Sequence, residues 1–135
     1  MLVIDASAVV EVVMGTPTGF VIEEAVFGSG ESIAAPHLID VEVLHVVRRC
    51  HRQRLLSTER SEQALQDLAN LPITRYGHLP LYSAIWRLRD HLTAYDAAYV
   101  ALAEMIDALI VTCDGKLARS TGHNVNVRLF DLSAS

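Results

Sequence analysis

The amino-acid sequence predicts an α/β fold built on a parallel sheet. Short β-like runs alternate along the chain with amphipathic helical segments, a pattern typical of parallel strands joined by helical crossovers. The first and fourth of these runs are apolar, as expected for strands that are buried on both faces. A chain of 135 residues fits one compact domain, so we expect residues 1–135 to form a single domain.

The expected strands are short, and stretches with helical periodicity separate them. The strands are Leu2–Asp5, Ser32–Ala35, Ile73–Tyr76, Leu109–Thr112 and Val127–Phe130. The helices are Ala8–Met14, Thr18–Phe27, Leu38–Arg54, Thr58–Asn70, Leu81–His91, Tyr95–Ile106 and Lys116–Thr121. Turn-forming residues at 28–30, 77–80 and 114–115 fall where these elements should end. Pro17 suits a helix start, and Thr58 is placed to cap the helix that follows it.

Four acidic residues stand beside expected strand ends or helix starts: Asp5, Glu42, Asp96 and Asp114. In an open α/β fold the ligand crevice lies at the carboxyl ends of the parallel strands, so we expect the four carboxylates to converge there. Each also has a structural explanation. Asp5 and Asp114 suit helix N-caps, Asp96 forms a capping-box pattern with Thr93, and Glu42 lies in the first turns of a helix.

Carboxylates that converge in this way favour a bound cation. Two carboxylates about 4 Å apart repel each other by roughly 4 kcal/mol at an effective dielectric constant near 20, and this repulsion raises their pKa values. An all-oxygen ligand set favours Mg²⁺ or Mn²⁺ over zinc. The six histidines show no HxxxH or HExxH spacing, so we do not expect them to be metal ligands.

A pair of acid-held Mg²⁺ ions suits the hydrolysis of phosphodiesters, because one ion lowers the pKa of the attacking water while the other stabilises the leaving oxygen. Ser7, two residues after Asp5, is placed to orient a water or a carboxylate, and it suits a helix cap equally well. We therefore include Ser7 with the four acids among the expected catalytic residues.

The net charge of −5 argues against a protein that binds nucleic acid through overall basicity. Contacts to a substrate backbone must then come from a few cations near the acids. The candidates are Lys116, Arg119 and Arg49. The arginine-rich segment 48–54 also suits a solvated helix face.

Composition sets further bounds. The chain is 51% hydrophobic and 20% charged, as expected of a globular protein. Its longest apolar stretch, Ala97–Ala103, is too short to cross a bilayer, and the N-terminus lacks the pattern of a secretory signal. We expect a cytoplasmic protein with no membrane partner. Cys50 and Cys113 have no CxxC spacing, and we expect two thiols rather than a disulfide.

Three segments of the sequence resemble the PIN-domain ribonucleases, and most closely the VapC toxins of type II toxin–antitoxin systems. They are residues 2–8 (LVIDASA), 92–103 (LTAYDAAYVALA) and 111–118 (VTCDGKLA), together with an acid at Glu42. The likeness runs from the first residue almost to the last.

The resemblance implies a three-layer α/β/α sandwich, endonucleolytic cleavage of RNA with Mg²⁺ or Mn²⁺, and a homodimer inhibited by a cognate VapB-like antitoxin. It makes Asp5 and Asp96 the main metal ligands, with Glu42 and Asp114 completing the acidic pocket directly or through water. Three other acids match no such role and are expected at helix ends or on the surface: Asp40, Asp107 and Asp131.

Binding of an antitoxin also has a physical rationale. An acidic pocket is a natural receptor for an inserted arginine, and the helices near the N-terminus carry more apolar residues than one core-facing stripe needs. Part of this surplus is expected to line a groove for the antitoxin. The candidate dimer contacts are Ala98, Tyr99, Leu102 and the helix that carries Trp86.

Three other functions fit parts of the pattern. A phosphatase with an aspartyl nucleophile also begins with a strand that ends in Asp, but it needs a second Asp where this chain has Ser7. A receiver domain needs a phosphorylatable Asp at the end of a central strand, and Ile73–Tyr76 offers none. The third alternative is a non-catalytic binding module on the same fold, which would show no metal-dependent RNA cleavage.

Overall fold

The computed structural model describes residues 1–131 of the chain. Within them, five parallel strands form one sheet in the order β3-β2-β1-β4-β5. The strands are β1 (Leu2–Ile4), β2 (Ile33–Pro36), β3 (Ile73–Tyr76), β4 (Leu109–Thr112) and β5 (Val127–Leu129). The predicted α/β fold with a parallel sheet is confirmed.

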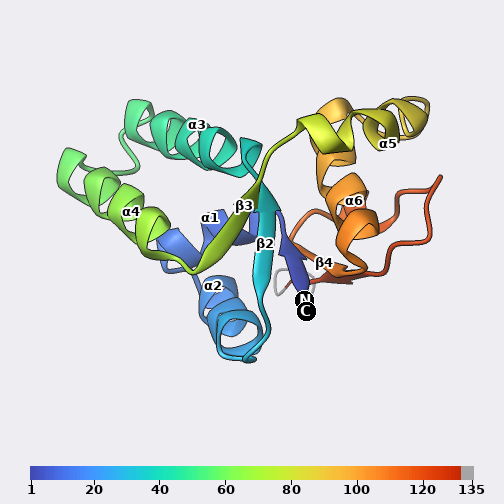
Figure 1. The fold of residues 1–135 in the computed structure, drawn as a ribbon. Coiled ribbons are helices and arrows are strands. Elements are labelled where there is room, and N and C mark those ends of the chain that lie inside the picture. Colours follow the sequence, from blue (N-terminus) through green and yellow to red (C-terminus); the bar gives the residue numbers. More distant parts are fainter. Residues whose placement is uncertain (132–135) are drawn as a thin grey trace.

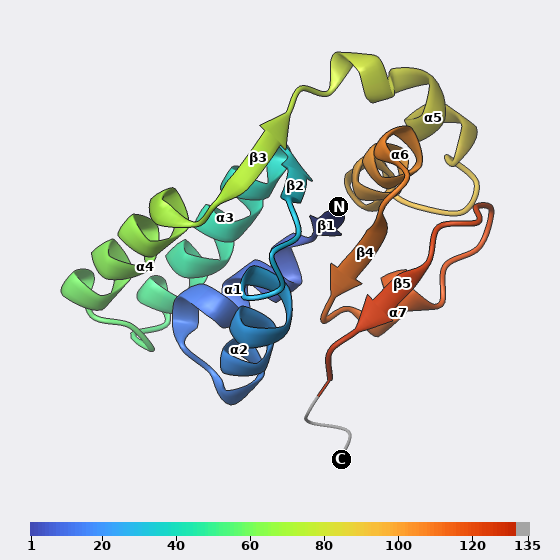
Figure 2. The same cartoon turned by 60° about the horizontal axis from the view of Figure 1, so that its bottom comes forward.

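Helices cover both faces of the sheet and produce the three-layer α/β/α sandwich (Figure 1). One face carries α1 (Ala6–Met14), α2 (Pro17–Ile22), α3 (Leu38–Arg52) and α4 (Thr58–Asn70), with a π-helical turn η1 (Glu23–Phe27) after α2. The other face carries α5 (Tyr82–Arg87) and α6 (Ala94–Ile106), preceded by a 3₁₀ turn η2 (Leu79–Leu81). Figure 2 shows the same two layers after rotation, with the short helix α7 (Gly115–Ala118) beside β5.

The strand order reverses between β1 and β4, and this reversal locates the crevice of the fold. The chain moves outward from β1 to β2 and β3, then returns to pair β4 with the other side of β1. At such a switch point the connections leave the two central strands in opposite directions, which opens a crevice at the carboxyl ends of these strands. Asp5 directly follows β1 and Asp114 lies two residues beyond β4, so both acids stand at this edge.

The middle of helix α6 is enclosed by the rest of the chain. Every residue from Ala97 to Ala103 is buried, because the sheet covers one side of the helix and α5 the other. Ala98, Tyr99 and Leu102 are at most 3% exposed, so the prediction that they form dimer contacts is wrong. Trp86 on α5 is 68% exposed and remains a candidate contact.

Several predicted element ends differ from the structure. Ser57 rather than Thr58 caps α4, because its extended backbone lets its hydroxyl accept a hydrogen bond from the Arg60 N–H at 3.0 Å. The helix expected over 81–91 ends at Arg87, and the one expected over 116–121 ends at Ala118.

Within residues 1–131 no single helix is long and apolar enough to cross a bilayer. Helix α1 and the segment α2–η1 meet the length and composition criteria only together, as a pair bent by 106°.

Glycine allows α1 and α2 to cross closely. Gly15 ends α1 in the left-handed conformation with φ of 67°, and Pro17 begins α2 as predicted. Gly19 of α2 lies against the backbone of α1, where an added Cβ would stand 2.0 Å from the carbonyl oxygen of Glu11. Only a residue without a side chain fits this crossing.

Replacement of Gly19 by alanine is expected to lower the free energy of unfolding by about 1–3 kcal/mol, because the methyl group would push apart two packed backbones. Urea unfolding followed by circular dichroism measures this change. Gly77→Ala is the matched control, since a Cβ at Gly77 meets no atom within 4 Å, and we expect its stability to match the wild type or slightly exceed it. Equal midpoints for the two variants would contradict the close crossing.

Candidate functional site

Asp5 is the centre of a hydrogen-bond network at the end of β1. Its side chain is buried, with 6% of the residue exposed. The Oδ1 atom accepts hydrogen bonds from the Ser7 hydroxyl at 2.7 Å and from the Ala8 backbone N–H at 3.2 Å. The Oδ2 atom accepts a hydrogen bond from the Thr112 hydroxyl at 2.6 Å. Asp5 therefore caps α1, which confirms the predicted N-cap, and it also joins the ends of β1 and β4.

Ser7 and Thr112 extend this junction to the backbone beyond β4. The Cys113 N–H donates to the Ser7 hydroxyl at 2.9 Å, and the Asp114 N–H donates to the Thr112 hydroxyl at 2.9 Å. The segment that carries Asp114 is thus fixed relative to Asp5. Ser7 orients a carboxylate, which is one of the roles that the sequence predicted for it.

Asp114 caps the short helix α7. Its Oδ1 atom accepts a hydrogen bond from the Lys116 N–H at 2.9 Å, so the predicted cap is present. Among the hydrogen bonds of residues 1–131, none uses the Oδ2 atom of Asp114. One carboxylate oxygen therefore remains available to a ligand.

Glu42 reaches the site from the second turn of α3. Its Oε1 atom accepts a hydrogen bond from the Tyr99 hydroxyl at 2.6 Å. Tyr99 is itself 2% exposed on the enclosed helix α6, so its position is fixed by the core. A buried phenol therefore holds the Glu42 carboxylate against the side of the site formed by α6.

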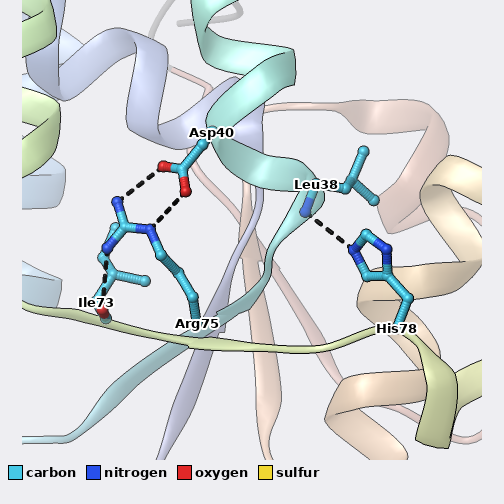
Figure 3. A network of polar contacts seen from close by, with 5 residues as sticks. All are labelled: Leu38, Asp40, Ile73, Arg75 and His78. Atoms are coloured by element: carbon cyan, nitrogen blue, oxygen red, sulfur yellow. Dashed lines mark hydrogen bonds and ion pairs between the residues drawn. The ribbon is translucent and has the colours of Figure 1, made fainter.

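The start of α3 is held by β3 and the turn after it (Figure 3). The Nε2 atom of His78 accepts a hydrogen bond from the Leu38 N–H at 3.0 Å, although no side chain of its own segment caps α3. The Arg75 guanidinium donates two hydrogen bonds to the Asp40 carboxylate, at 2.8 and 2.9 Å. Asp40 is thus a helix-start acid, as predicted, and the turn before Glu42 is anchored at two points.

Asp96 lies in the first turn of α6 without serving as a cap. The Thr93 hydroxyl accepts a hydrogen bond from the Asp96 N–H at 3.2 Å, so Thr93 is the N-cap. Among the hydrogen bonds of residues 1–131, the Asp96 carboxylate accepts none from the backbone N–H of Thr93, so the capping box is incomplete. The carboxylate of Asp96 is free of a structural role in its own helix.

The four acids lie close enough to repel one another. Burial raises the pKa of Asp5 from 3.8 to about 6, and the charge of Asp114 adds to this shift. The pKa of Asp96 is raised by burial and then by Asp114, while Lys116 lowers it. The pKa of Glu42 is raised by burial and then by Asp96, against the lowering effect of Tyr99. Asp5, Asp114, Asp96 and Glu42 thus form an electrostatically connected set at one edge of the sheet.

The site offers the donor chemistry of a hard divalent cation but not a closed ligand cage. Its acids present carboxylate oxygens, each with two lone pairs, so Asp5 can bind a ligand while it accepts its hydrogen bonds. Within residues 1–131 no three His, Cys, Asp or Glu side chains are close enough to hold a metal ion together. Mg²⁺ can bind through one or two carboxylates while it keeps several waters, so the donor chemistry of the site does not require a closed cage for this ion.

Two cavities flank the acids. The larger, of about 810 Å³, is lined by Ser7 and Glu42 together with Tyr95 and Arg49. The smaller, of about 400 Å³, is lined by Asp96 and Lys116 with Arg89, His91, Leu92, Thr93 and Ser120. Two predicted cations, Arg49 and Lys116, therefore line different cavities. The third, Arg119, folds its guanidinium over Gly115 at the start of α7.

The two cysteines are free thiols, as predicted. Burial raises the pKa of Cys113 to about 12, and the charges of Glu11, Asp5 and Asp131 add to the shift. The Cys113 thiol therefore stays protonated at neutral pH. Although it lines the larger cavity, it is a poor nucleophile.

Sequence reasoning missed the roles of Thr112 and Tyr99 in the site. Thr112 is fully buried at the end of an apolar strand, and a hydroxyl in such a run was a signal that it binds a polar partner. Tyr99 lies three residues after Asp96 on the same helix, a spacing that places both on one face. Nothing in the sequence pairs Tyr99 with Glu42, which lies 57 residues earlier.

Comparison with known proteins gives a consistent result. The family model of the PIN domain matches residues 2–122. Ribonuclease VapC12 of Mycobacterium tuberculosis is 37% identical over 129 residues, which cover 96% of this chain and 98% of that protein. Ribonuclease VapC1 of the same organism is 39% identical over 129 residues, covering 94% and 96%. In structure the chain resembles VapBC2 from Rickettsia felis bound to a DNA fragment from their promoter, with a TM-score of 0.69, 14% identity, and coverage of 96% of this chain and 98% of that chain.

The raised pKa of Asp5 predicts a pH dependence of stability without added metal. The folded state keeps a proton on Asp5 that the unfolded chain has lost by about pH 4, so this residue stabilises the fold fully below pH 3.8 and ceases to do so as the pH rises through about 6. The loss corresponds to about 3 kcal/mol. Urea unfolding of the wild type and of Asp5→Asn in EDTA, from pH 3.5 to pH 7, measures this loss. The free energy of unfolding of the wild type minus that of the variant should fall as the pH rises. A difference that does not change with pH would contradict the burial of this carboxylate.

Proposed function

Because the chain belongs to the PIN-domain family, and within it to the VapC ribonuclease toxins, we propose that it is an endoribonuclease toxin that cleaves RNA with Mg²⁺ or Mn²⁺ and is inhibited by a cognate VapB-like antitoxin. The observation that carries the proposal is a set of four acids at the sheet switch point, which repel one another in the pairs Asp5–Asp114, Asp114–Asp96 and Asp96–Glu42. Residues 1–135 would form one domain. This domain would act on its RNA substrate in the cytoplasm.

Asp5, Asp96, Asp114 and Glu42 would hold the metal, directly or through its waters. When bound, the ion supplies a water of lowered pKa and positive charge for the leaving oxygen. Ser7 and Thr112 fix the Asp5 carboxylate through hydrogen bonds of 2.7 and 2.6 Å, and Tyr99 fixes Glu42. These three hydroxyls act by positioning, because the Oδ2 atom of Asp5 and the Glu42 carboxylate each keep lone-pair capacity for a ligand beside these hydrogen bonds.

Cations near the acids support the binding of a phosphodiester backbone. Arg49 lines the larger cavity and Lys116 the smaller one, and Arg119 directly follows α7 with its guanidinium over Gly115. An RNA strand that crosses the acids would meet a cation in each cavity. Local positive charge of this kind offsets the net charge of −5.

The same features support inhibition by a partner protein. A structure similar to this chain is the VapBC2 complex, and an acidic crevice suits an arginine inserted by a partner. Most apolar residues of α1, α2 and η1 pack in the core, but Phe20 and Val21 remain 63% and 38% exposed and would contribute to an antitoxin groove. We also propose a homodimer, with the exposed Trp86 helix as its candidate contact.

The deciding experiment is to express the chain in bacterial cells and to map new RNA 5′ ends. The wild type should stop growth and produce discrete new ends, and Asp5→Asn should do neither. Asp107→Asn is the matched control, since it makes the same chemical change at an exposed helix end, in a left-handed conformation that asparagine tolerates. Identical RNA ends in the wild type and in Asp5→Asn would favour a non-catalytic binding module.

Asp96→Asn is expected to reduce RNA cleavage by more than about 100-fold, because even partners of metal ligands contribute 10- to 100-fold. Addition of EDTA to the wild type should have the same effect. The metal-free variant should be as stable as the wild type or more so, since it loses the repulsion from Asp114. Mg²⁺ at 100 times its dissociation constant should stabilise the wild type by about 2.7 kcal/mol, and the variant less. A large loss of stability in metal-free Asp96→Asn would instead indicate a structural role for this acid.

Arg49→Ala is expected to weaken RNA binding and to lower the slope of log K against log salt concentration by about 0.7, the value for one phosphate contact with a single strand. Arg48→Ala is the control, because Arg48 is also exposed on α3 but lines a different cavity with Leu44 and Leu65. Fluorescence anisotropy with labelled RNA in an Asp5→Asn background measures both slopes. Equal changes for the two arginines would mean that the run contributes only general charge.

A further inference from the structure

We propose that the larger cavity beside the acids receives the base of an unpaired nucleotide next to the cleaved phosphate, and that this base stacks on Tyr95. The inference rests on the proposed function and assigns a further residue, Tyr95, to the binding of its RNA substrate. It concerns the cavity of about 810 Å³ between α1 and α3.

Among the contacts within residues 1–131, no hydrogen bond, ion pair or ring contact of the Tyr95 side chain explains its position. Tyr95 is 65% exposed, whereas Tyr99, one turn later on α6, is 2% exposed and hydrogen-bonded to Glu42. Tyr95 directly precedes Asp96 in the chain, and Tyr95 lines the cavity together with Ser7 and Glu42. An aromatic ring is therefore presented beside the carboxylates without being used by the core.

The cavity has a reacting end and a cationic end. Ser7, Glu42 and Cys113 line it near the acids, and His45 and Arg49 line it further along α3. Two turns of helix, or about 10 Å, separate Glu42 from Arg49. This distance leaves room for a nucleoside between the cleavage site and a cation that would meet the next phosphate.

Much of the remaining wall is apolar, although Glu11 also lines it. The apolar residues include Val10 of α1 and Leu38, Val41 and Val46 of α3, of which Val41 is 63% exposed. Cavities of 300–1,000 Å³ with apolar walls and a few polar groups are typical binding sites for small planar ligands. An apolar wall, an exposed aromatic ring and a nearby arginine together match the features that bind unpaired bases.

A base within a duplex cannot reach such a site, because its faces are covered by its neighbours. The base that stacks on Tyr95 must therefore be unpaired. This contact differs from those of Lys116 and Arg49, which would bind the phosphate backbone of any strand.

A chemical double-mutant cycle tests the inference. The substrate is a synthetic RNA that spans a mapped cleavage site, and each base within two nucleotides of the cleaved bond is removed in turn to leave an abasic sugar. For the wild type, removal of one particular base should lower kcat/KM by about 5- to 100-fold, the range of base–aromatic stacking. Tyr95→Ala should show a similar loss with the intact RNA and no further loss with that abasic RNA. Tyr95→Phe should behave as the wild type, because it keeps the ring.

Tyr82→Ala provides the matched control, since Tyr82 is 61% exposed on α5 and does not line the cavity. Its cost of base removal should equal that of the wild type. The inference is overturned if Tyr95→Ala retains the full cost of base removal at every position, or if it loses activity equally on intact and abasic RNA, as it would if the cavity served a partner protein or the ring only supported Asp96. Absence of any cleavage by the wild type would instead refute the proposed function, and the inference would fall with it.

Discussion

The site depends on one buried carboxylate that is shared by two strands. Asp5 accepts hydrogen bonds from Ser7 and Ala8 of α1 and from Thr112 of β4. The ends of β1 and β4 are therefore joined through a single side chain. Burial favours the protonated form of Asp5, as its raised pKa shows. A cation bound at this junction would therefore stabilise the charged form of Asp5.

The other acids reach this junction through separate supports. Asp114 follows β4 and is held by the Thr112 hydroxyl through its backbone N–H. Glu42 depends on the start of α3, which His78 and Arg75 anchor from the neighbouring β3 segment, and on Tyr99 from the opposite helical layer. Residues from both layers thus converge across the edge of the sheet. A change in the packing of one layer would move one carboxylate relative to the others.

Structural and functional explanations of the acids are not exclusive here. Asp5 and Asp114 cap helices with one oxygen, and each carboxylate keeps lone pairs for a ligand. The N-terminus of a helix also favours negative charge, so a cap is a low-cost place to keep a carboxylate near others. Asp96 differs, because Thr93 supplies the cap and the Asp96 side chain is left for the crevice.

The sequence alone determined the parallel α/β fold, the exact bounds of α4, β3 and β4, and the identity of the acids at the strand ends. These features follow from local periodicity, from apolar runs and from short turns, which a chain displays directly. The tertiary structure alone decided that Tyr99 belongs to the core and holds Glu42 rather than facing a second copy, that Thr112 joins Asp5, and that Tyr95 faces a cavity. Each of these depends on contacts between residues far apart in the chain. Tyr95 and Tyr99 lie one turn apart on α6, so their spacing does not distinguish a buried ring from an exposed one. Only the packing of the sheet and α5 decides which ring is buried.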